Sequence, residues 1–449
     1  MGQVDQSLLG RLSAFRESFG TLGLILMFCA ACVVVAIALW RGPGLMLFVL
    51  FLTYATGAIA QGGIIFLSTV VRWFFLGLLG LMIFRKHPRM KFTMIFVIIY
   101  LLLGFLGNIQ SPVFMWTIQQ TVLLAMAILF IPIAVNSYVT DFDKVAKIFK
   151  MGIAAATVWI AANIMFLGEF RYATEERFTS SEGIGAVVVA YSGVFFAPMI
   201  VWGILQSRYK IWKLYSMVLM VPFLVVLLVG AVRSALLGMV LIASIPILVA
   251  KLRPTKLIAG LGVFCFMLAA SVYGLFAFFP AKAQVLYERL LTTSTTGRSY
   301  VWVWALEKCV NEALWGHGIG SADIVGRIQF GMFFHNAYLQ VWYNSGFFGL
   351  VAILVFIGIY VLKSLRLAYF QPATEIKEYG SVALGYMLGI IATSMFEGVF
   401  ATAGGIGITM LMITAAIIDR LGQMQADTAN DNLDQTDEYD LPDWSLQNA

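Results

Sequence analysis

The sequence predicts an all-α, polytopic membrane protein, and three observations lead to that fold class. Of the 449 residues, 61% are hydrophobic and only 12% are charged, and the mean hydropathy is +0.90. A soluble domain of this length could not bury so much apolar surface. Apolar runs close to the roughly 20 residues that cross a bilayer recur along the chain. These runs are continuously apolar rather than alternating, which predicts helices and not barrel strands.

The apolar runs form thirteen segments in order along the chain. They lie at about 21–40, 44–60, 64–84, 92–107, 117–136, 151–168, 183–205, 214–232, 234–250, 257–280, 338–362, 380–397 and 404–419. Thirteen crossings would place Arg11 and Arg16 on the side opposite to the other basic loops. One of the first three segments is therefore expected to be short, tilted or re-entrant, which leaves about 12 transmembrane helices.

Lysine and arginine in short loops predict the orientation, because these residues are retained on the cytoplasmic side. From Arg85 onward, basic loops alternate with poorly basic ones. The basic residues are Arg85, Lys86, Arg89 and Lys91, then Lys144, Lys147 and Lys150, then Arg208, Lys210 and Lys213, then Lys251, Arg253 and Lys256, then Lys363, Arg366 and Lys377. The larger loop at 281–337, between the tenth and eleventh segments, is then on the outer side, which in a bacterium is the periplasmic face of the inner membrane.

Four regions follow from this pattern. Residues 1–280 form a transmembrane helical block, and 281–337 form a periplasmic loop region whose short helices carry the candidate catalytic motifs. Residues 338–422 form the C-terminal transmembrane helices. Residues 423–449 contain seven acidic residues and no Lys or Arg, which predicts a disordered cytoplasmic tail. We expect membrane lipids as partners and find no nucleic-acid module.

The cysteines and glycines predict neither a metal site nor a cofactor. Cys29, Cys32 and Cys265 fall in apolar segments and Cys309 in the loop, so no disulfide framework is expected. No Cys/His spacing is typical of zinc, and no glycine-rich loop is typical of a nucleotide site.

Arg298 is the first candidate site residue, in the segment TGRSYVWVWALE. Gly297 precedes an apolar, Trp-rich helical run, so Arg298 is expected in the first helical turn. A cation there opposes the helix dipole, but a guanidinium beside exposed N–H groups suits a phosphate. The alternative is that Arg298 snorkels to lipid phosphates or pairs with Glu288 or Glu307.

His335 and Asn336 come directly before the apolar helix that is predicted near Tyr338. The positive end of the helix disfavours imidazolium, so His335 is expected to be neutral and able to act as a general base. The alternative is a histidine that only caps the helix. His317, in WGHGIG, lies between glycines and is expected to be a turn residue near the site.

Arg233 and Glu397 are the candidates outside the loop. Arg233 lies in LLVGAVRSALLGMV, between two apolar runs, and an arginine so close to hydrocarbon usually faces a cavity or a partner. The alternative is an interfacial arginine that snorkels outward. Glu397, in TSMFEGVF, is expected to form an ion pair with one of the arginines; the alternatives are a second proton acceptor or an exposed loop residue. Both residues are predicted at the outer ends of their spans, on the side of Arg298 and His335.

Two arginines and a neutral histidine on one face suit a particular reaction type. The arginines would hold a pyrophosphate leaving group, and the histidine would take a proton from an attacking hydroxyl.

This ordered set resembles the O-antigen ligase and O-antigen polymerase superfamily of bacterial envelope proteins. VRSA at Arg233 resembles the family's first essential arginine, and TGRSYVW at Arg298 resembles its loop arginine. WGHGIGS resembles its glycine turn, and HNAYLQVWYNSGFFGL resembles its HN-x-x-L-x(6)-G signature, with His335 in the catalytic position. These motifs lie between about residues 225 and 400.

The resemblance implies an inverting, metal-independent glycosyltransferase whose donor is a glycan linked to undecaprenyl pyrophosphate. Arg233 and Arg298 would bind the pyrophosphate, and His335 would activate an acceptor hydroxyl. The acceptor would be a lipid A core sugar in a ligase, or a growing polysaccharide in a polymerase. The signature does not separate these two activities.

Two other classes of protein remain as alternatives. A flippase for lipid-linked oligosaccharides would also need arginines, but it predicts charged residues throughout the spans and internal repeats. Here the candidates cluster on one face and no repeat is evident. An intramembrane hydrolase would need a Ser/His pair or an Asp dyad in the spans, and the sequence offers neither.

Overall fold

The computed structural model describes most of the chain outside the N-terminal region and the segment before Arg298. The described residues are 42–57, 63–84, 91–166, 172–173, 177–178, 186–229, 232–249, 298–312, 314–370, 374–401 and 405–439, with the single residues 266, 273 and 277. The predicted segment at 21–40 lies outside this set, as does nearly all of the segment at 257–280. The predicted tail after residue 439 also lies outside it.

The described part is α-helical, as the composition predicts. Its helices are α2 (Pro43–Gly57), α3 (Gly63–Phe84), α4 (Met94–Gly107), α5 (Phe114–Tyr138), α6 (Phe142–Phe166), α7 (Ala186–Leu205), α8 (Lys210–Val229), α9 (Arg233–Val249), α12 (Arg298–Asn311), α13 (Ser321–Phe330), α14 (Ala337–Tyr369), α15 (Thr374–Ser394) and α16 (Ile406–Tyr439). A 3-10 turn, η1 (Asn108–Gln110), follows α4. Two-residue strands β1 (Tyr172–Ala173) and β2 (Arg177–Phe178) pair antiparallel, with Tyr172 opposite Phe178.

Four of the described helices contain a stretch long and apolar enough to cross a membrane. These stretches are Phe114–Tyr138, Lys210–Leu228, Ala337–Tyr369 and Ile406–Asp427. Shorter apolar helices cover five further predicted segments, at Pro43–Ala55, Val70–Gly80, Met94–Gln110, Ser192–Leu205 and Arg233–Val249. The helical class is therefore confirmed, whereas the count of about twelve crossings stays a prediction.

Two helices differ in extent from their predicted segments. α6 begins at Phe142, so the lysines at 144, 147 and 150 lie in its first turns and not in a loop. α16 continues to Tyr439, into the segment predicted as a disordered tail from residue 423. This stretch has no proline before Pro442 and contains helix-compatible Gln, Met and Ala, so its acidic residues do not prevent a helical backbone.

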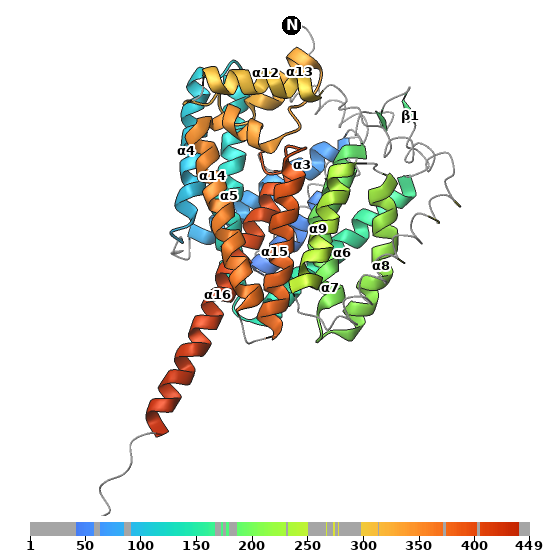
Figure 1. Ribbon diagram of the computed structural model, residues 1–449, viewed down its shortest axis with the longest axis vertical. Coiled ribbons are helices and arrows are strands. Elements are labelled where there is room, and N and C mark those ends of the chain that lie inside the picture. Colours follow the sequence, from blue (N-terminus) through green and yellow to red (C-terminus); the bar gives the residue numbers. More distant parts are fainter. Residues whose placement is uncertain are drawn as a thin grey trace, which may run out of the picture.

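The helices pack as one bundle with a continuous apolar core (Figure 1). α15 packs against α9 and α14, α14 against α4, and α16 against α5. α9 and α15 approach closely at small residues: a Cβ at Gly389 would lie 2.9 Å from the Gly238 carbonyl oxygen. Small residues at such contacts are typical of helix pairs in membranes. This contact brings the C-terminal end of α15 beside the first turn of α9.

α12 and α13 lie across one end of the bundle, which we call the capped end (Figure 1). α12 buries Val301, Ala305 and Cys309 against a small apolar cluster that includes Phe334 and Tyr343. The packing fixes the segment between α13 and α14, in which the candidate histidine lies.

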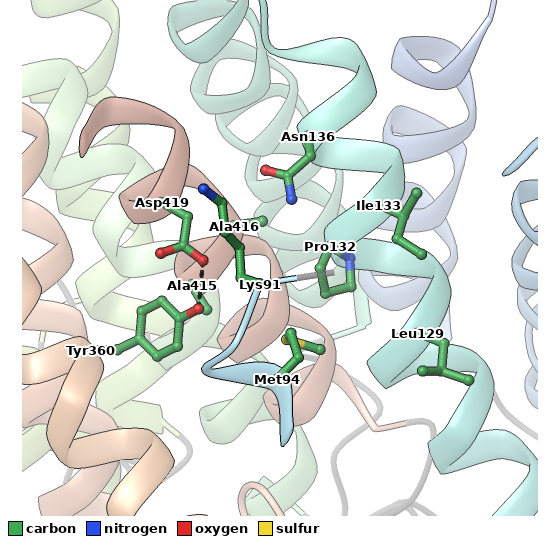
Figure 2. Close-up of a pocket in the computed structure, with 10 residues that line it drawn as sticks. All are labelled: Lys91, Met94, Leu129, Pro132, Ile133, Asn136, Tyr360, Ala415, Ala416 and Asp419. Atoms are coloured by element: carbon green, nitrogen blue, oxygen red, sulfur yellow. Dashed lines mark hydrogen bonds between the residues drawn. The ribbon is translucent and has the colours of Figure 1, made fainter. Parts of the chain in front are cut away.

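The opposite end of the bundle has a polar pocket of its own (Figure 2). Tyr360 of α14 donates a 2.6 Å hydrogen bond to Asp419 of α16, and Lys363 pairs with the other oxygen of that carboxylate. Lys91 and Asn136 also line this pocket. The two ends therefore carry separate polar groups, with the apolar core between them.

Candidate active site

Asn336 caps the first turn of α14 at the capped end of the bundle. Its Oδ1 accepts the backbone N–H of Tyr338 at 3.0 Å and of Leu339 at 3.1 Å, which satisfies two donors that a helix start leaves open. Its Nδ2 donates to the Met395 carbonyl oxygen at 3.0 Å. The predicted helix start is thus confirmed, and the cap also binds the loop that follows α15.

A second bond holds the same loop to α14. The Ala337 N–H donates to the Glu397 carbonyl oxygen at 3.1 Å. Glu397 is therefore fixed by its own backbone next to His335, although the two residues are far apart in the sequence.

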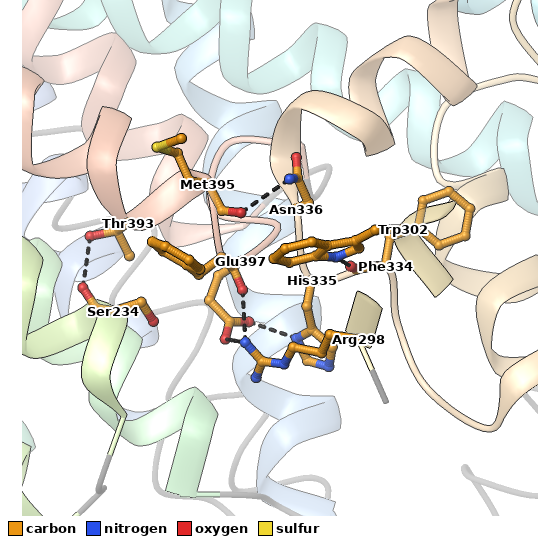
Figure 3. Close-up of polar contacts among 10 residues, drawn as sticks. Ser234, Arg298, Trp302, Phe334, His335, Asn336, Thr393, Met395 and Glu397 are labelled. Carbon is orange, nitrogen blue, oxygen red and sulfur yellow. Dashed lines mark hydrogen bonds and ion pairs between the residues drawn. The ribbon is translucent and has the colours of Figure 1, made fainter. Parts of the chain in front are cut away.

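The Glu397 carboxylate lies between Arg298 and His335 (Figure 3). Its Oε2 lies 2.7 Å from His335 Nδ1, and its Oε1 lies 3.0 Å from Arg298 Nη1. The Glu397 side chain is 3% exposed and that of His335 is 12% exposed. The ion pair between Glu397 and an arginine, which the sequence predicts, is present. The contact with His335 was not predicted.

The contact with Glu397 determines which nitrogen of His335 can accept a proton. A carboxylate at Nδ1 favours the tautomer with a proton on Nδ1, so Nε2 has the lone pair that can accept another proton. The same carboxylate would stabilise the imidazolium that forms. His335 also has a φ of +49°, a left-handed conformation that is uncommon for residues other than glycine. Such conformations cluster at functional sites.

Arg298 is the first residue of α12, as predicted. Its Nη1 donates to the Phe396 carbonyl oxygen at 3.1 Å, in addition to the charge contact with Glu397. Its Nε is buried and has no hydrogen-bond partner among the described residues. The guanidinium is thus held through Nη1, whereas Nε is not hydrogen-bonded to any described residue. The group lies beside the first N–H groups of α12.

Arg233 is the first residue of α9, and it is exposed. The next residue, Ser234, accepts a hydrogen bond at its carbonyl oxygen from Thr393 Oγ1 at 3.3 Å (Figure 3). Thr393 lies near the end of α15, four residues before Glu397. The structure therefore brings the start of α9 to the capped end. The Glu397 carboxylate contacts Arg298 and His335.

His317 belongs to a turn that packs farther along α14. Its Nε2 lies 2.9 Å from Glu312 Oε2, and its backbone N–H donates to the Tyr343 carbonyl oxygen. Burial lowers the pKa of His317, and the nearby Glu312 opposes that shift. Gly316 has no room for a side chain, because a Cβ would overlap the Asn344 backbone. The structure brings His317 to the second turn of α14, where it contacts Tyr343, and its ion-pair partner is Glu312 and not Glu397.

Two further residues near the site were missed from the sequence. Asp323 of α13 accepts a 2.8 Å hydrogen bond from Gln340 Nε2, and burial raises the pKa of Asp323 to about 6. Gln340 is 3% exposed, and a Cβ at Gly398 would overlap its amide, so this pair supports the loop next to Glu397. The single acid in IGSADIVG was the available signal.

Trp302 holds the segment directly before His335. Its Nε1 donates to the Phe334 carbonyl oxygen at 2.6 Å. Trp302 therefore joins α12 to the backbone carbonyl directly before the candidate histidine. None of the described His, Cys, Asp and Glu side chains form a group of three that could hold a metal ion.

Part of the chain matches the model of a known protein family. Residues 215–354 match the model of a family described as O-antigen ligase. The match includes Arg233, Arg298, His317, His335 and Asn336, and it ends before Glu397. No curated protein matches the chain. Residues 215–354 are thus similar to O-antigen ligases, which confirms the resemblance that the sequence motifs indicate.

Proposed function

We propose that the protein transfers a glycan from undecaprenyl pyrophosphate to an acceptor hydroxyl, with inversion and without a metal ion, at the periplasmic face of the bacterial inner membrane. The acceptor is a lipid A core sugar or a growing polysaccharide. The family match supports a ligase or polymerase role. The observation that carries the proposal is the Glu397 carboxylate shared by His335 and Arg298.

His335 is the proposed general base. The acceptor oxygen attacks the anomeric carbon of the donor sugar, and its proton passes to His335 Nε2. The bond between that carbon and the pyrophosphate oxygen breaks, and undecaprenyl pyrophosphate leaves with the electron pair. Glu397 keeps Nδ1 protonated and stabilises the imidazolium, which later releases its proton to water.

Arg298 and Arg233 are the proposed pyrophosphate ligands. The Arg298 guanidinium, whose side chain is 24% exposed, and the first N–H groups of α12 suit the oxygens of a phosphate. Donors that are fixed before the substrate binds stabilise the charge that develops on the leaving group. Asn336 is a positioning residue in this scheme, because it holds the loop of Glu397 against the start of α14.

The test measures release of undecaprenyl pyrophosphate by the purified protein in lipid nanodiscs, with a lipid-linked glycan donor. His335→Ala and Glu397→Gln are expected to lower kcat about 100-fold or more, because general-base catalysis contributes roughly that much. Arg298→Lys is expected to lose most activity, since lysine lacks the forked donor. Arg208→Lys is the matched control, because Arg208 lies in exposed ion pairs away from the capped end.

Each outcome bears on a separate part of the proposal. Normal release by His335→Ala would refute the assignment of the base. Normal release by Arg298→Lys would favour the alternative in which Arg298 snorkels to lipid phosphates. Activity abolished by EDTA and restored by Mg²⁺ would contradict the metal-independent mechanism. Core-sugar acceptors and polysaccharide acceptors, tested side by side, distinguish a ligase from a polymerase.

A further inference from the structure

α12 has two apolar faces, of which only one packs against the protein. Val301, Ala305 and Cys309 are 0–3% exposed and face the cluster around Phe334. Val303, Leu306 and Val310 are 47–58% exposed. At 100° per residue these three side chains form one stripe, on the side of the helix away from Ala305. A helix that only covered the bundle would have no reason for the second apolar face.

The exposed stripe continues onto a helix that is long enough to cross a membrane. After α12, Leu314 and Trp315 are 54% and 57% exposed. The Leu314 carbonyl oxygen packs against Gly346 of α14, because a Cβ at Gly346 would overlap it. The next residues of α14, Phe347 and Phe348, are 43% and 57% exposed.

The outward face of α14 is apolar well beyond Phe348. Val351, Leu354, Val355 and Leu362 of this helix are 37–65% exposed, with the spacing of one helix face. On a membrane-spanning helix such a face contacts lipid. The apolar surface therefore runs from the lipid-facing side of α14, through Trp315, to the stripe of α12.

The position and polar residues of α12 fit a membrane surface. α12 lies across the end of the bundle and not along it (Figure 1). Glu307, Asn311 and Glu312 are exposed polar residues beside or beyond the stripe. Tyr300 is 71% exposed at its edge, and tyrosine and tryptophan are typical of the boundary between lipid and water.

We infer that α12 is an interfacial helix, whose Val303, Leu306 and Val310 lie in the lipid of the leaflet at the capped end of the bundle. A phospholipid bilayer is the partner, because the stripe is continuous with a lipid-facing surface and the helix lies across the bundle axis. Arg298 begins the same helix, so the membrane contact sets the height of its guanidinium at the level of the lipid phosphates. This last consequence rests on the proposed function.

The first test measures the depth of single side chains and needs no enzymatic activity. Val303→Cys, Val310→Cys and Asn311→Cys are made in a background without the native cysteines, labelled with an environment-sensitive fluorophore, and placed one protein per nanodisc. The probe at 303 and 310 is expected to emit at shorter wavelength and to be quenched by lipids with a nitroxide high on the acyl chain. The probe at 311, which is exposed but outside the stripe, is the matched control.

Two results would overturn the inference. Water-like emission at 303 and 310 would show that the stripe faces solvent. A short-wavelength emission that lipid nitroxides do not quench would show that protein, such as a second copy, covers the stripe.

The second test asks whether this contact serves the lipid-linked donor. Val303→Asp is expected to raise KM for the donor about 10-fold while kcat changes less than about twofold, because a buried charge weakens membrane docking and not proton transfer. Asn311→Asp adds the same charge outside the stripe and should leave both constants unchanged. Equal effects of the two variants would refute the role. If wild-type protein shows no transfer, the proposed function fails, but the fluorescence result stands.

Discussion

Two acidic side chains at the capped end, Glu397 and Asp323, differ in how far their surroundings compensate a negative charge. Glu397 is almost fully buried, but it has a guanidinium and an imidazole as partners, so its negative charge is compensated. Asp323 accepts a 2.8 Å hydrogen bond from a neutral amide, and its pKa rises to about 6 because burial disfavours the carboxylate, although the charge of Arg327 opposes this shift. The first arrangement keeps a charge in place for chemistry, whereas the second makes stability depend on pH.

Asp323→Asn is expected to stabilise the protein above pH 6. The folded-state pKa of Asp323 is raised from 3.8 to about 6, so this carboxyl does not destabilise the fold below about pH 4 and destabilises it increasingly as the pH rises toward 6. Asparagine can keep the bond from Gln340 but cannot ionise. The variant should therefore gain about 3 kcal/mol over the wild type across this range and keep that gain at pH 8.

Thermal unfolding in detergent at several pH values measures this difference. Asp323→Ala is the companion variant, because it also cannot ionise but loses the hydrogen bond with Gln340. It should gain less than Asp323→Asn. A difference between Asp323→Asn and the wild type that does not change with pH would contradict the prediction.

At the level of single residues, the sequence identified the polar groups but not all of their contacts. Arg298, His335 and Glu397 stand out because they are charged or titratable residues next to apolar runs. The bond from His335 to Glu397 joins residues 62 positions apart, and it depends on how α15 packs against α14. No local pattern specifies such packing. Asp323 was missed because an acid within a short loop helix has no unusual neighbours in the sequence.

The kink in α14 shows how one element shapes the capped end. Gly346 has a φ of +73° and interrupts the helical dihedral angles between its two halves. The turn that contains His317 packs against this interruption: the Gly318 N–H donates to the Asn344 carbonyl oxygen at 2.9 Å. The kink thus frees backbone groups in α14 and offers them to the turn, as is typical where a spanning helix is broken next to other protein segments.

Gly346→Ala is expected to destabilise the protein by about 2 kcal/mol or more, because a Cβ is strained at this φ and overlaps the Leu314 carbonyl oxygen. Gly358→Ala in the same helix is the matched control, since a Cβ there meets no atom within 4 Å. The control should be neutral or slightly stabilising, as alanine is the better helix former. Thermal unfolding in detergent measures both variants, and equal effects would contradict the account of the kink.

Helix boundaries were predictable where the sequence carries a local signal. The starts of α12 and α14 follow from Gly297 and Asn336, which leave a clear boundary before an apolar run. The start of α6 was missed because its lysines were assigned to a loop, although lysine is a good helix former. The continuation of α16 to Tyr439 was missed for a similar reason, since acidic composition predicts solvation but does not exclude a helix.

On the scale of the whole molecule, the bundle has two polar ends of different composition. The capped end has Arg298, His335 and Glu397 in a buried cluster. The opposite end has exposed ion pairs, such as that of Arg208 with Asp143 at 3.0 Å, and lysines near the ends of the helices. Positive residues concentrated at one end of a membrane bundle favour the cytoplasmic side for that end.

Labelling in cells tests this orientation. In a background without native cysteines, Asn311→Cys at the capped end is expected to react with a membrane-impermeant maleimide in intact spheroplasts. Asp427→Cys on α16 should react only after the membrane is permeabilised, because the basic loops predict that this end is inside. Both residues are exposed, so access to the reagent does not limit either reaction. The reverse pattern would invert the predicted topology.

The three bonds around Asn336 have a mechanical consequence. Because α14 and the loop after α15 are joined at Met395 and at the Glu397 backbone, the imidazole and the carboxylate move as one rigid unit. The Thr393 hydroxyl, near the end of α15, also joins this unit to the Ser234 carbonyl oxygen at the start of α9. The separation of Arg233 from the His335–Glu397 pair therefore depends on how α9 packs against α15.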